Sequence, residues 1–492
     1  MDFVFNTLRY IGILFLVVMV FNLMILVHEW GHFLAAKWRG LKVEKFYIWF
    51  GKPIWKKTIN GVEYGLGSIP AGGFVALPQM APMDAIEGES DTPREALPPI
   101  TPLDKIIVAF AGPLFSFMLA CVFAVIVWQV GKPVGEDAVT TEIGYVVKDS
   151  AGDKAGLKAG DVVKTIDGEP AYRFRGLVDS VQWLVIASKE DNIKFVVDRP
   201  GEGEKTISVA AEKPPLENQA WWQGFFARPQ LREAGIAGKQ TPMVGKTIPY
   251  SPAEEAGLKP SDLITAVDGV EIRHPAQFMD YVKANPDKAL ALSVKRGDQM
   301  LNVSVTPRVP DHLPAAYEPN HKLIGIDWDR QGQRRLDHPK PQEQIKDALM
   351  TMVNTIKAIA TPKGDVGAGH LSGPIGIGRV YYTLFEDSYG WQLVLWFSVV
   401  LNVNLAVMNM LPFPVLDGGH ITMAILEWIR KRPLNLRVLE FVQTACVFLL
   451  LGFMVFVTMK DVGDLFGGGR KAAQDVPRFL PPAERAPAAP AN

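Results

Sequence analysis

The chain has 492 residues, of which 48% are hydrophobic and 21% are charged, and its mean hydropathy is +0.11. The charged share lies below the ~25% of an ordinary soluble protein, yet it is too high for a chain that lies wholly in lipid. The 51 Lys and Arg balance the 52 Asp and Glu, so no net field attracts nucleic acid, and a nucleic-acid partner is excluded as a first interpretation. Cys121 and Cys446 lie in apolar runs and offer neither a disulfide framework nor a cysteine zinc site. Composition therefore predicts membrane spans combined with aqueous domains.

Four uncharged apolar runs approach or exceed the ~20 residues that cross a ~30 Å hydrocarbon core. A cleaved signal peptide is the alternative for the first run. However, its leading segment carries only Arg9, no small-residue cleavage site follows, and the run continues into His28 and Glu29. We therefore predict four transmembrane helices, within residues 1–36, 106–131, 388–417 and 439–460.

The placement of Lys and Arg predicts the orientation of these spans. Basic residues crowd the segment after the first span and the loop between the third and fourth spans. The positive-inside rule therefore places residues 37–105 in the cytoplasm, and the termini and the long central segment on the outer side. Within the outer part, residues 344–387 contain apolar positions at helical spacing and predict an amphipathic helix region. Residues 467–492 are rich in Gly, Ala and Pro and predict a disordered tail.

The central segment contains an internal repeat. Residues 150–169 and 251–270 match at 8 of 20 positions, with an offset of 101 residues. Each copy reads as a short helix ending at Gly156 or Gly257, then a strand and an Asp-Gly turn. The repeat predicts two copies of one small domain, at residues 143–213 and 240–310, and both resemble PDZ domains. Such domains bind peptide C-termini by strand addition, and a spacer or steric filter is an equal alternative.

The motif H-E-x-x-H occurs once, as His28-Glu29-Trp30-Gly31-His32. Residues four apart share one helix face, so His28 and His32 can bind one zinc ion, and Glu29 beside them can take a proton from water. Ionisable groups at the end of an apolar run are costly in lipid unless they serve a polar site. Two core histidines bonded to backbone carbonyls are the alternative.

A catalytic zinc takes three protein ligands and leaves one position for water. The third ligand must come from the cytoplasmic side, because His28 follows 17 helical residues, or about 25 Å of rise, from the outer end of its span. The third span ends in N-x-x-P-x-P-x-L-D-G-G-H at residues 409–420, where prolines break the helix and glycines let the backbone bend. Asp417 thereby reaches the depth of His28, and His420 is an alternative on spacing alone.

The two motifs together resemble those of the site-2 proteases, the intramembrane zinc metalloproteases. The tandem PDZ insert makes the chain similar to the regulator-of-sigma-E protease type of Gram-negative bacteria. Further matches are I-P-A-G-G-F at 69–74, similar to the family's membrane-associated β-hairpin, A-G-P at 111–113 and L-S-G-P at 371–374. Residues 76–77 are Ala-Leu, where relatives often carry Lys-Met.

The resemblance implies a role for each matching residue. The third zinc ligand is implied to be Asp417, not His420, and Glu29 is implied to be the catalytic base. Substrate binding is implied for a further set: Asn404, Asn409, Gly72, Gly73 and Phe74.

The fold class that we expect is a polytopic α-helical membrane protein with four transmembrane helices, a membrane-associated β-hairpin and two inserted α+β PDZ domains. The expected function is cleavage of transmembrane segments of single-pass proteins, such as trimmed anti-sigma factors or remnant signal peptides, in the bacterial inner membrane with one zinc ion. A membrane-anchored PDZ scaffold is an alternative, but it would need no His28, Glu29 or Asp417. A transporter would carry polar residues at matching positions in two halves, whereas the apolar runs of the second and fourth spans, residues 106–130 and 441–459, hold no charged residue. Bound zinc distinguishes the enzyme from both.

Overall fold

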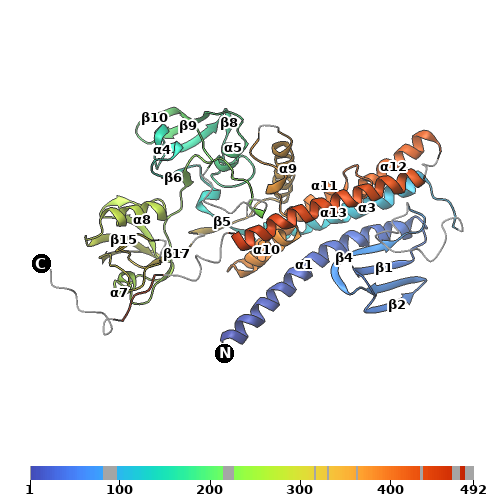
Figure 1. The fold of residues 1–492 in the computed structure, drawn as a ribbon, viewed down its shortest axis with the longest axis horizontal. Coiled ribbons are helices and arrows are strands. Elements are labelled where there is room, and N and C mark those ends of the chain that lie inside the picture. The colour runs from blue at the N-terminus through green and yellow to red at the C-terminus, as the bar shows by residue number, and fades with distance from the viewer. Residues whose placement is uncertain are drawn as a thin grey trace. The chain divides into compact units, whose positions relative to one another are not determined.

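The computed structural model describes residues 2–80, 97–213, 226–314, 317–329, 332–361, 364–432, 436–467 and 477–481. The chain divides into two compact units (Figure 1). The first comprises Met1–Lys132, Asp337–Val353 and Ser372–Met459, and the second comprises Pro133–Leu336, Asn354–Leu371 and Lys460–Asn492. Residues 81–96 of the segment that we expect in the cytoplasm, and most of the expected tail after residue 467, lie outside the described residues.

Four described helices are long and apolar enough to cross a membrane, which agrees with the expected number of spans. They are α1 (Asp2–Trp38), α3 (Pro102–Val130), α11 (Gly390–Asn409) and α13 (Leu436–Gly467). Large apolar side chains such as Leu14 and Phe448 are mostly exposed on their surfaces, as expected for helices that face lipid. The start of α3 is fixed by a capping box between Thr101 and Asp104, with Pro102 at the first helical position.

Helices α1 and α3 approach each other closely at Gly31. A Cβ at Gly31 would stand 2.8 Å from the carbonyl carbon of Ala111, so only glycine permits this spacing. The middle glycine of the H-E-W-G-H motif therefore has a packing role. It brings the histidine face of α1 against α3.

The first unit also contains a four-stranded sheet, of which the expected hairpin is one part. Its strands are β1 (Lys45–Phe50), β2 (Trp55–Ile59), β3 (Val62–Leu66) and β4 (Ile69–Ala76). Their order is β2-β3-β1-β4, with β1 parallel to β3 and antiparallel to β4. Phe46 and Val75 of this sheet share a buried cluster with Ala36 of α1 and Val108 of α3. The sheet is thus fixed to the two helices, and β4 is one of its two edge strands.

The two repeats form two domains with the same order of elements. The first contains β6 (Ile143–Val146), α4 (Ala151–Ala155), β7 (Val162–Ile166), β8 (Glu169–Pro170), α5 (Val181–Ala187), β9 (Ile193–Arg199), β10 (Gly203–Val209) and β11 (Ile236–Gly238). The second contains β12 (Val244–Thr247), α7 (Pro252–Glu255), β13 (Leu263–Val267), β14 (Val270–Glu271), α8 (Pro275–Ala284), β15 (Leu290–Arg296), β16 (Gln299–Val305) and β17 (Ile326–Trp328).

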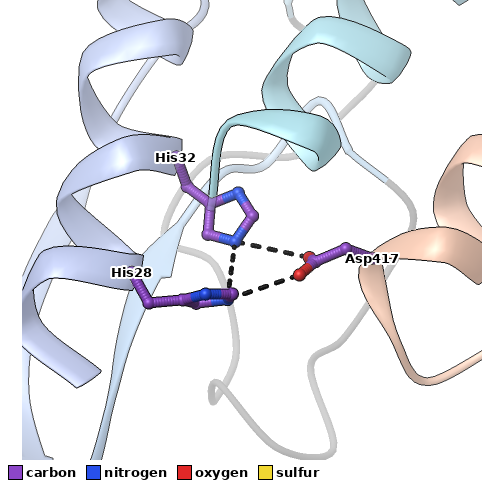
Figure 2. A group of neighbouring side chains, drawn as sticks. All are labelled: His28, His32 and Asp417. Atoms are coloured by element: carbon purple, nitrogen blue, oxygen red, sulfur yellow. Dashed lines mark hydrogen bonds and ion pairs between the residues drawn. The ribbon is translucent and has the colours of Figure 1, made fainter. Parts of the chain in front are cut away.

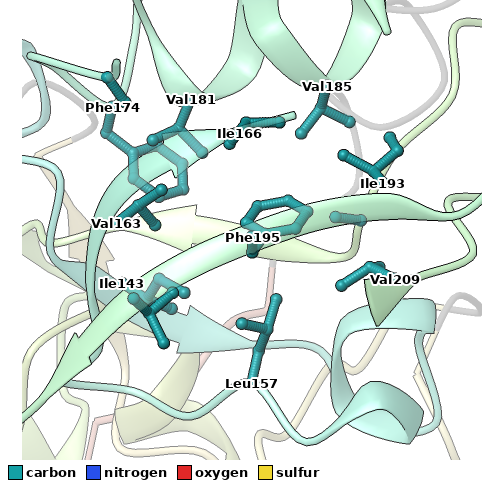
Figure 3. Close-up of a cluster of buried hydrophobic side chains, with 13 residues drawn as sticks. Ile143, Leu157, Val163, Ile166, Phe174, Val181, Val185, Ile193, Phe195 and Val209 are labelled. Atoms are coloured by element: carbon teal, nitrogen blue, oxygen red, sulfur yellow. The ribbon is translucent and has the colours of Figure 1, made fainter. Parts of the chain in front are cut away.

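Each PDZ domain closes with a strand that lies beyond the repeat. The four-stranded sheets have the orders β10-β9-β7-β8 and β14-β13-β15-β16, and the second sheets are β11-β6 and β12-β17. The domains therefore extend to Gly238 and Trp328, past residues 213 and 310. Figure 3 shows the core of the first domain, where Phe195 is surrounded by aliphatic side chains such as Ile143, Leu157 and Val209.

The repeat signature A-G-L-K-x-x-D is explained by one ion pair in each domain. Asp161 is almost fully buried and binds Arg199 at 2.7 Å through both carboxylate oxygens. The same guanidinium donates to the carbonyl of Gly156. Asp262 and Arg296 form the corresponding pair in the second domain. The signature therefore ties the short helix to the last long hairpin, and the charge buried in each domain is paired and hydrogen-bonded.

The remaining elements connect these parts. They are β5 (Lys132–Gly135), β18 (Arg334–Asp337), α9 (Pro341–Ala360), α10 (Pro374–Glu386), α12 (Asp417–Arg430) and the 3₁₀ turns Glu136–Ala138 and Ala368–His370. Helices α9 and α10 occupy most of the region 344–387 that was expected to be amphipathic and helical. Helix α12 follows the third span directly and was not expected from the sequence.

Candidate metal centre

Helix α1 presents His28 and His32 one turn apart, and Asp417 is the first residue of α12. Helix α11 ends at Asn409, and the intervening turn contains Pro412 and Pro414, which cannot continue a helix. The backbone then folds back tightly, which requires the two glycines after Asp417.

Neither Gly418 nor Gly419 has room for a side chain, as the position of an added Cβ shows. At Gly418 it would stand 2.5 Å from the carbonyl oxygen of Leu411, and at Gly419 it would stand 2.5 Å from the carbonyl carbon of Phe413. The L-D-G-G motif is therefore a geometric requirement. It places the carboxylate of Asp417 at the beginning of α12, where that carboxylate meets the two histidines of α1.

The side chains of His28, His32 and Asp417 converge on one point (Figure 2). The Nε2 atoms of the two histidines lie 3.3 Å apart, and each lies 3.3 Å from one carboxylate oxygen of Asp417. A tetrahedral zinc ion with ligand distances of about 2.0–2.1 Å separates its ligand atoms by about 3.3 Å. The donor set and its spacing therefore fit zinc.

The second nitrogen of each ring holds the imidazole in this orientation. Nδ1 of His32 lies 2.8 Å from the carbonyl oxygen of Val108, and Nδ1 of His28 lies 3.0 Å from Oγ of Ser116, which is fully buried. Because a carbonyl only accepts, Nδ1 of His32 carries the proton and Nε2 presents a lone pair to the carboxylate. An imidazole lone pair and a carboxylate at this distance repel one another unless a cation lies between them.

Helix α3 forms the wall behind the two imidazoles. A Cβ at Gly112 would stand 2.5 Å from Cε1 of His32 and 2.9 Å from Nε2 of His28. The A-G-P segment of the second span therefore leaves room for the two rings. Any side chain at this position would occupy the space in which the metal-binding atoms converge.

These three side chains line a cavity of about 200 Å³ that also contains Glu29. The other lining residues come from β4 and the turn after it, from α3, from the end of α11 and from the start of α12 with the two residues before it: Val75, Leu77, Met80, Val108, Ala109, Asn409, Val415, Leu416 and His420. Gly73 of β4 lies beside Glu29, because a Cβ at Gly73 would stand 3.5 Å from Cγ of Glu29. The edge strand of the sheet therefore borders the carboxylate of the H-E-x-x-H motif.

The residues predicted to bind substrate differ in how close they lie to the three converging side chains. Nδ2 of Asn409 lies 3.3 Å from Nε2 of His28, at the site itself. Asn404 is not among the described residues that line the cavity, and its buried Oδ1 accepts no hydrogen bond from the described part of the chain. Phe74 stacks on Phe50, and a Cβ at Gly72 would collide with the ring of Phe50. Among residues 72–74, Gly73 is thus the one placed next to the H-E-x-x-H helix.

Sequence reasoning missed the residues of α3 that orient the histidines. Ser116 and the carbonyl of Val108 carry no motif of their own. The A-G-P match gave one signal, since small residues in a span permit close helix packing. It did not reveal that Gly112 faces the imidazoles.

Comparison with known families bears directly on this centre. The model of Peptidase family M50 matches residues 15–453, a range that includes both motifs and both PDZ domains. The chain belongs to this family. It is therefore a zinc metalloprotease of the site-2 type, as the paired motifs predicted.

Relatives with curated descriptions match nearly end to end. A protein of Neisseria meningitidis serogroup A, described as "Putative zinc metalloprotease", is 29% identical over 476 residues, which cover 92% of this chain and 99% of the relative. The "Regulator of sigma-E protease RseP" of Escherichia coli K12 is 28% identical over 470 residues, covering 89% of this chain and 96% of the relative. Among solved structures, a PDZ domain of an SdrC-like protein from Listeria monocytogenes covers 19% of this chain and 90% of its own, at 22% identity and a TM-score of 0.16.

Proposed function

We propose that this M50 peptidase cleaves transmembrane segments of single-pass membrane proteins with one zinc ion held by His28, His32 and Asp417. The observation that carries the proposal is the mutual spacing of 3.3 Å between the two Nε2 atoms and the carboxylate oxygens. All three side chains are largely withdrawn from solvent. Such a cluster serves no scaffold or spacer role and is costly without a cation.

When bound, zinc supplies a Lewis acid that polarises the scissile carbonyl and makes a neighbouring water more acidic. The residue that we assign as general base is Glu29, which lines the same cavity and precedes Trp30 on the helix that carries both histidines. Its carboxylate accepts the proton of the attacking water and returns it to the leaving amine.

Substrate must be extended before it can react, because the backbone of a helix is fully hydrogen-bonded. The edge strand β4 supports a way to hold it, since an extended segment can add to a free sheet edge. Gly73 lies on this strand beside Glu29, and Gly72 and Phe74 flank it. We assign these residues to substrate binding together with Asn409, whose amide lies at the site, and with Asn404, five residues before it on α11.

The substrate class that we propose is a single-pass protein of the anti-sigma-factor type, already trimmed on its outer side. The relatives named as regulators of sigma E support this class. The distribution of Lys and Arg supports an inner-membrane protein with its active site near the cytoplasm and its PDZ domains in the periplasm. Those domains then act either on peptide C-termini or as a size filter.

Metal analysis of the detergent-purified protein tests this proposal. We expect one zinc per chain in the wild type and less than one tenth of that in His28→Ala. Glu29→Gln is the matched variant, since it should keep zinc and lose proteolysis by ~10²–10⁴-fold. Equal zinc in wild type and His28→Ala would overturn the metal assignment, and near-normal cleavage by Glu29→Gln would overturn the assignment of the base.

A further inference from the structure

A five-residue segment of the C-terminal tail, residues 477–481, lies against the second PDZ domain. The backbones of Arg478 and His312 exchange two hydrogen bonds, at 3.0 and 3.1 Å. The amide of Leu480 also donates to Oδ2 of Asp311 at 2.7 Å. The segment is thus held as a short extended strand, within a region whose composition predicts disorder.

Phe479 is the side chain of this segment that the domain buries. It is 5% exposed, whereas its neighbour Leu480 is 39% exposed. The guanidinium of Arg308 lies 5.2 Å from the centre of the Phe479 ring, and a Cβ at Gly325 would stand 3.2 Å from Cε2 of that ring. The ring therefore fits between a cation and a bare stretch of backbone, which favours an aromatic side chain at this position.

The residues that contact Phe479 are held in place by other contacts within the second domain. The guanidinium of Arg308 donates to the carbonyl of Tyr250 at 2.6 Å, which fixes the cation. Gly325 adopts a φ of +81°, in the turn that leads into β17, and its carbonyl accepts from Ser251. The site therefore consists of positions that the fold of the domain already constrains.

The first PDZ domain offers a different surface at the equivalent place. A backbone bridge joins Arg308 to Leu323, two residues before Gly325, and the same bridge joins Glu212 to Glu233, two residues before Gly235. Glu212 therefore stands where the second domain has Arg308. An acidic side chain cannot make a cation–π contact with an aromatic ring. The site for Phe479 is thus specific to the second domain.

We propose that residues 477–481 form a strap that docks on the second PDZ domain and limits how far that domain moves from the end of α13, with Phe479 as the anchoring side chain. Ten residue steps separate Gly467, the end of α13, from Pro477. A fully extended chain spans at most about 3.6 Å per residue, so the docked strap keeps its site within about 36 Å of the end of the last span. This inference goes beyond the proteolytic function and does not depend on it.

Hydrogen exchange on the full-length protein in detergent tests the docking. Truncation after residue 476 and Phe479→Ala should each speed exchange of the amides in residues 308–325 by about tenfold or more, because backbone hydrogen bonds and the ring contact are lost. Leu480→Ala is the matched control, since that side chain is exposed, and it should leave the rates within about twofold of the wild type. A synthetic peptide of residues 474–484 should restore protection to the truncated protein, and the same peptide with Phe479→Ala should not. Unchanged exchange in both variants would overturn the docking.

A second experiment tests whether the strap limits the movement of the second PDZ domain. Spin labels at the exposed residues Leu465 and Met300, in a chain with Cys121 and Cys446 replaced by Ser, report the distance between the end of α13 and the second PDZ domain. We expect the distance distribution to broaden when residues 477–492 are removed. An equally broad distribution with and without the tail would mean that the segment docks without acting as a strap.

Discussion

Gly112 of α3 lies so close to His32 of α1 that a Cβ at Gly112 would stand 2.5 Å from Cε1 of the imidazole. The same Cβ would stand 2.9 Å from Nε2 of His28. The second span therefore shapes the metal centre although it contributes no side chain that could bind the ion. The two imidazoles can therefore take these positions only because residue 112 has no Cβ.

Gly112→Ala should weaken zinc binding by at least about tenfold, as expected when the surroundings of ligands are disturbed. Gly452→Ala is the matched control, because Gly452 lies on the described part of α13 with nothing within 4 Å of its added Cβ. Zinc content after dialysis against a graded series of chelator concentrations measures the effect. Equal retention by the two variants would show that the imidazoles can shift without cost.

Ser116 acts on His28 from outside the donor set. Its hydroxyl lies 3.0 Å from Nδ1 of His28. Ser116→Ala should lower zinc affinity by about 10–100-fold, since partners of this kind orient the metal-binding imidazole. Ser398→Ala removes a comparably buried hydroxyl that bonds Tyr381 instead, and it should leave zinc affinity unchanged. If the two variants lose zinc equally, the hydroxyl of Ser116 has only a packing role.

The choice between Asp417 and His420 can also be decided directly. Both line the cavity, but among the described residues the cluster of converging donor atoms contains Asp417 and not His420. We expect Asp417→Ala to lose zinc and proteolysis together and His420→Ala to retain most of both. Parallel measurements of zinc content and substrate cleavage would contradict the assignment if the two variants behaved in the reverse way.

The sequence predicted those parts of the molecule whose signals are local. We could predict that the two motifs lie at the same depth in the membrane. This prediction used only the helical spacing of His28 and His32 and the prolines before Asp417. The four apolar runs were likewise sufficient for the four spans. In each case the predicted feature depends on one short segment of the chain, because helix geometry and backbone restriction act within a few residues.

The parts that the sequence did not predict depend on contacts between distant segments. The strands β11 and β17 lie outside the predicted domain bounds and pair with β6 and β12 near the beginning of each domain. Two further features also depend on contacts between distant segments. They are the parallel pairing of β1 with β3 and the docking of Phe479. A short strand has little periodicity of its own, so only the partner that it finds in the fold defines it.

Acidification should loosen the contact between the two PDZ domains through His274. Its ring stacks on Tyr145 of the first domain, and its Nδ1 accepts the amide of Ala276 at the start of α8. Burial lowers the pKa of His274, while the carboxylate of Asp137 opposes that shift. The unfolded state therefore binds the proton more readily. The stability that depends on neutral His274 is complete above its unfolded pKa of about 6.5 and is lost as the pH falls below that value.

Exchange rates of α8 amides in the full chain, corrected for intrinsic rates at pH 7.5 and 5.5, measure this effect. We expect lower protection at pH 5.5 in the wild type and a much smaller change in His274→Asn, since Asn keeps a capping acceptor and does not titrate. The carboxylate of Asp268 does not interfere, because the Ala291 amide and Lys288 hold its pKa below the usual range and it stays ionised in this window. Identical pH dependence in both proteins would assign the effect to another group.

Deletion of both PDZ domains should separate a size filter from a peptide receptor. The two domains are inserted between α3 and α11, and the second of them ends at β17. The deletion should therefore span residues 143–328, with a Gly/Ser linker, so that no orphan strand remains. If the domains exclude bulky ectodomains, this variant should keep zinc and cleave untrimmed substrates that the wild type rejects.

A receptor for new C-termini predicts a different pattern. Substitutions in the carboxylate-binding loops of the two domains should raise KM for trimmed substrates more than they lower kcat. We expect the filter pattern, because a protease that cuts many single-pass proteins gains little from one required terminal sequence. Paired assays of trimmed and untrimmed forms of one substrate, run on both kinds of variant, distinguish the two. Strict rejection of the untrimmed form by the deletion variant would exclude the filter, since the rejection would then come from a part of the chain other than the two domains.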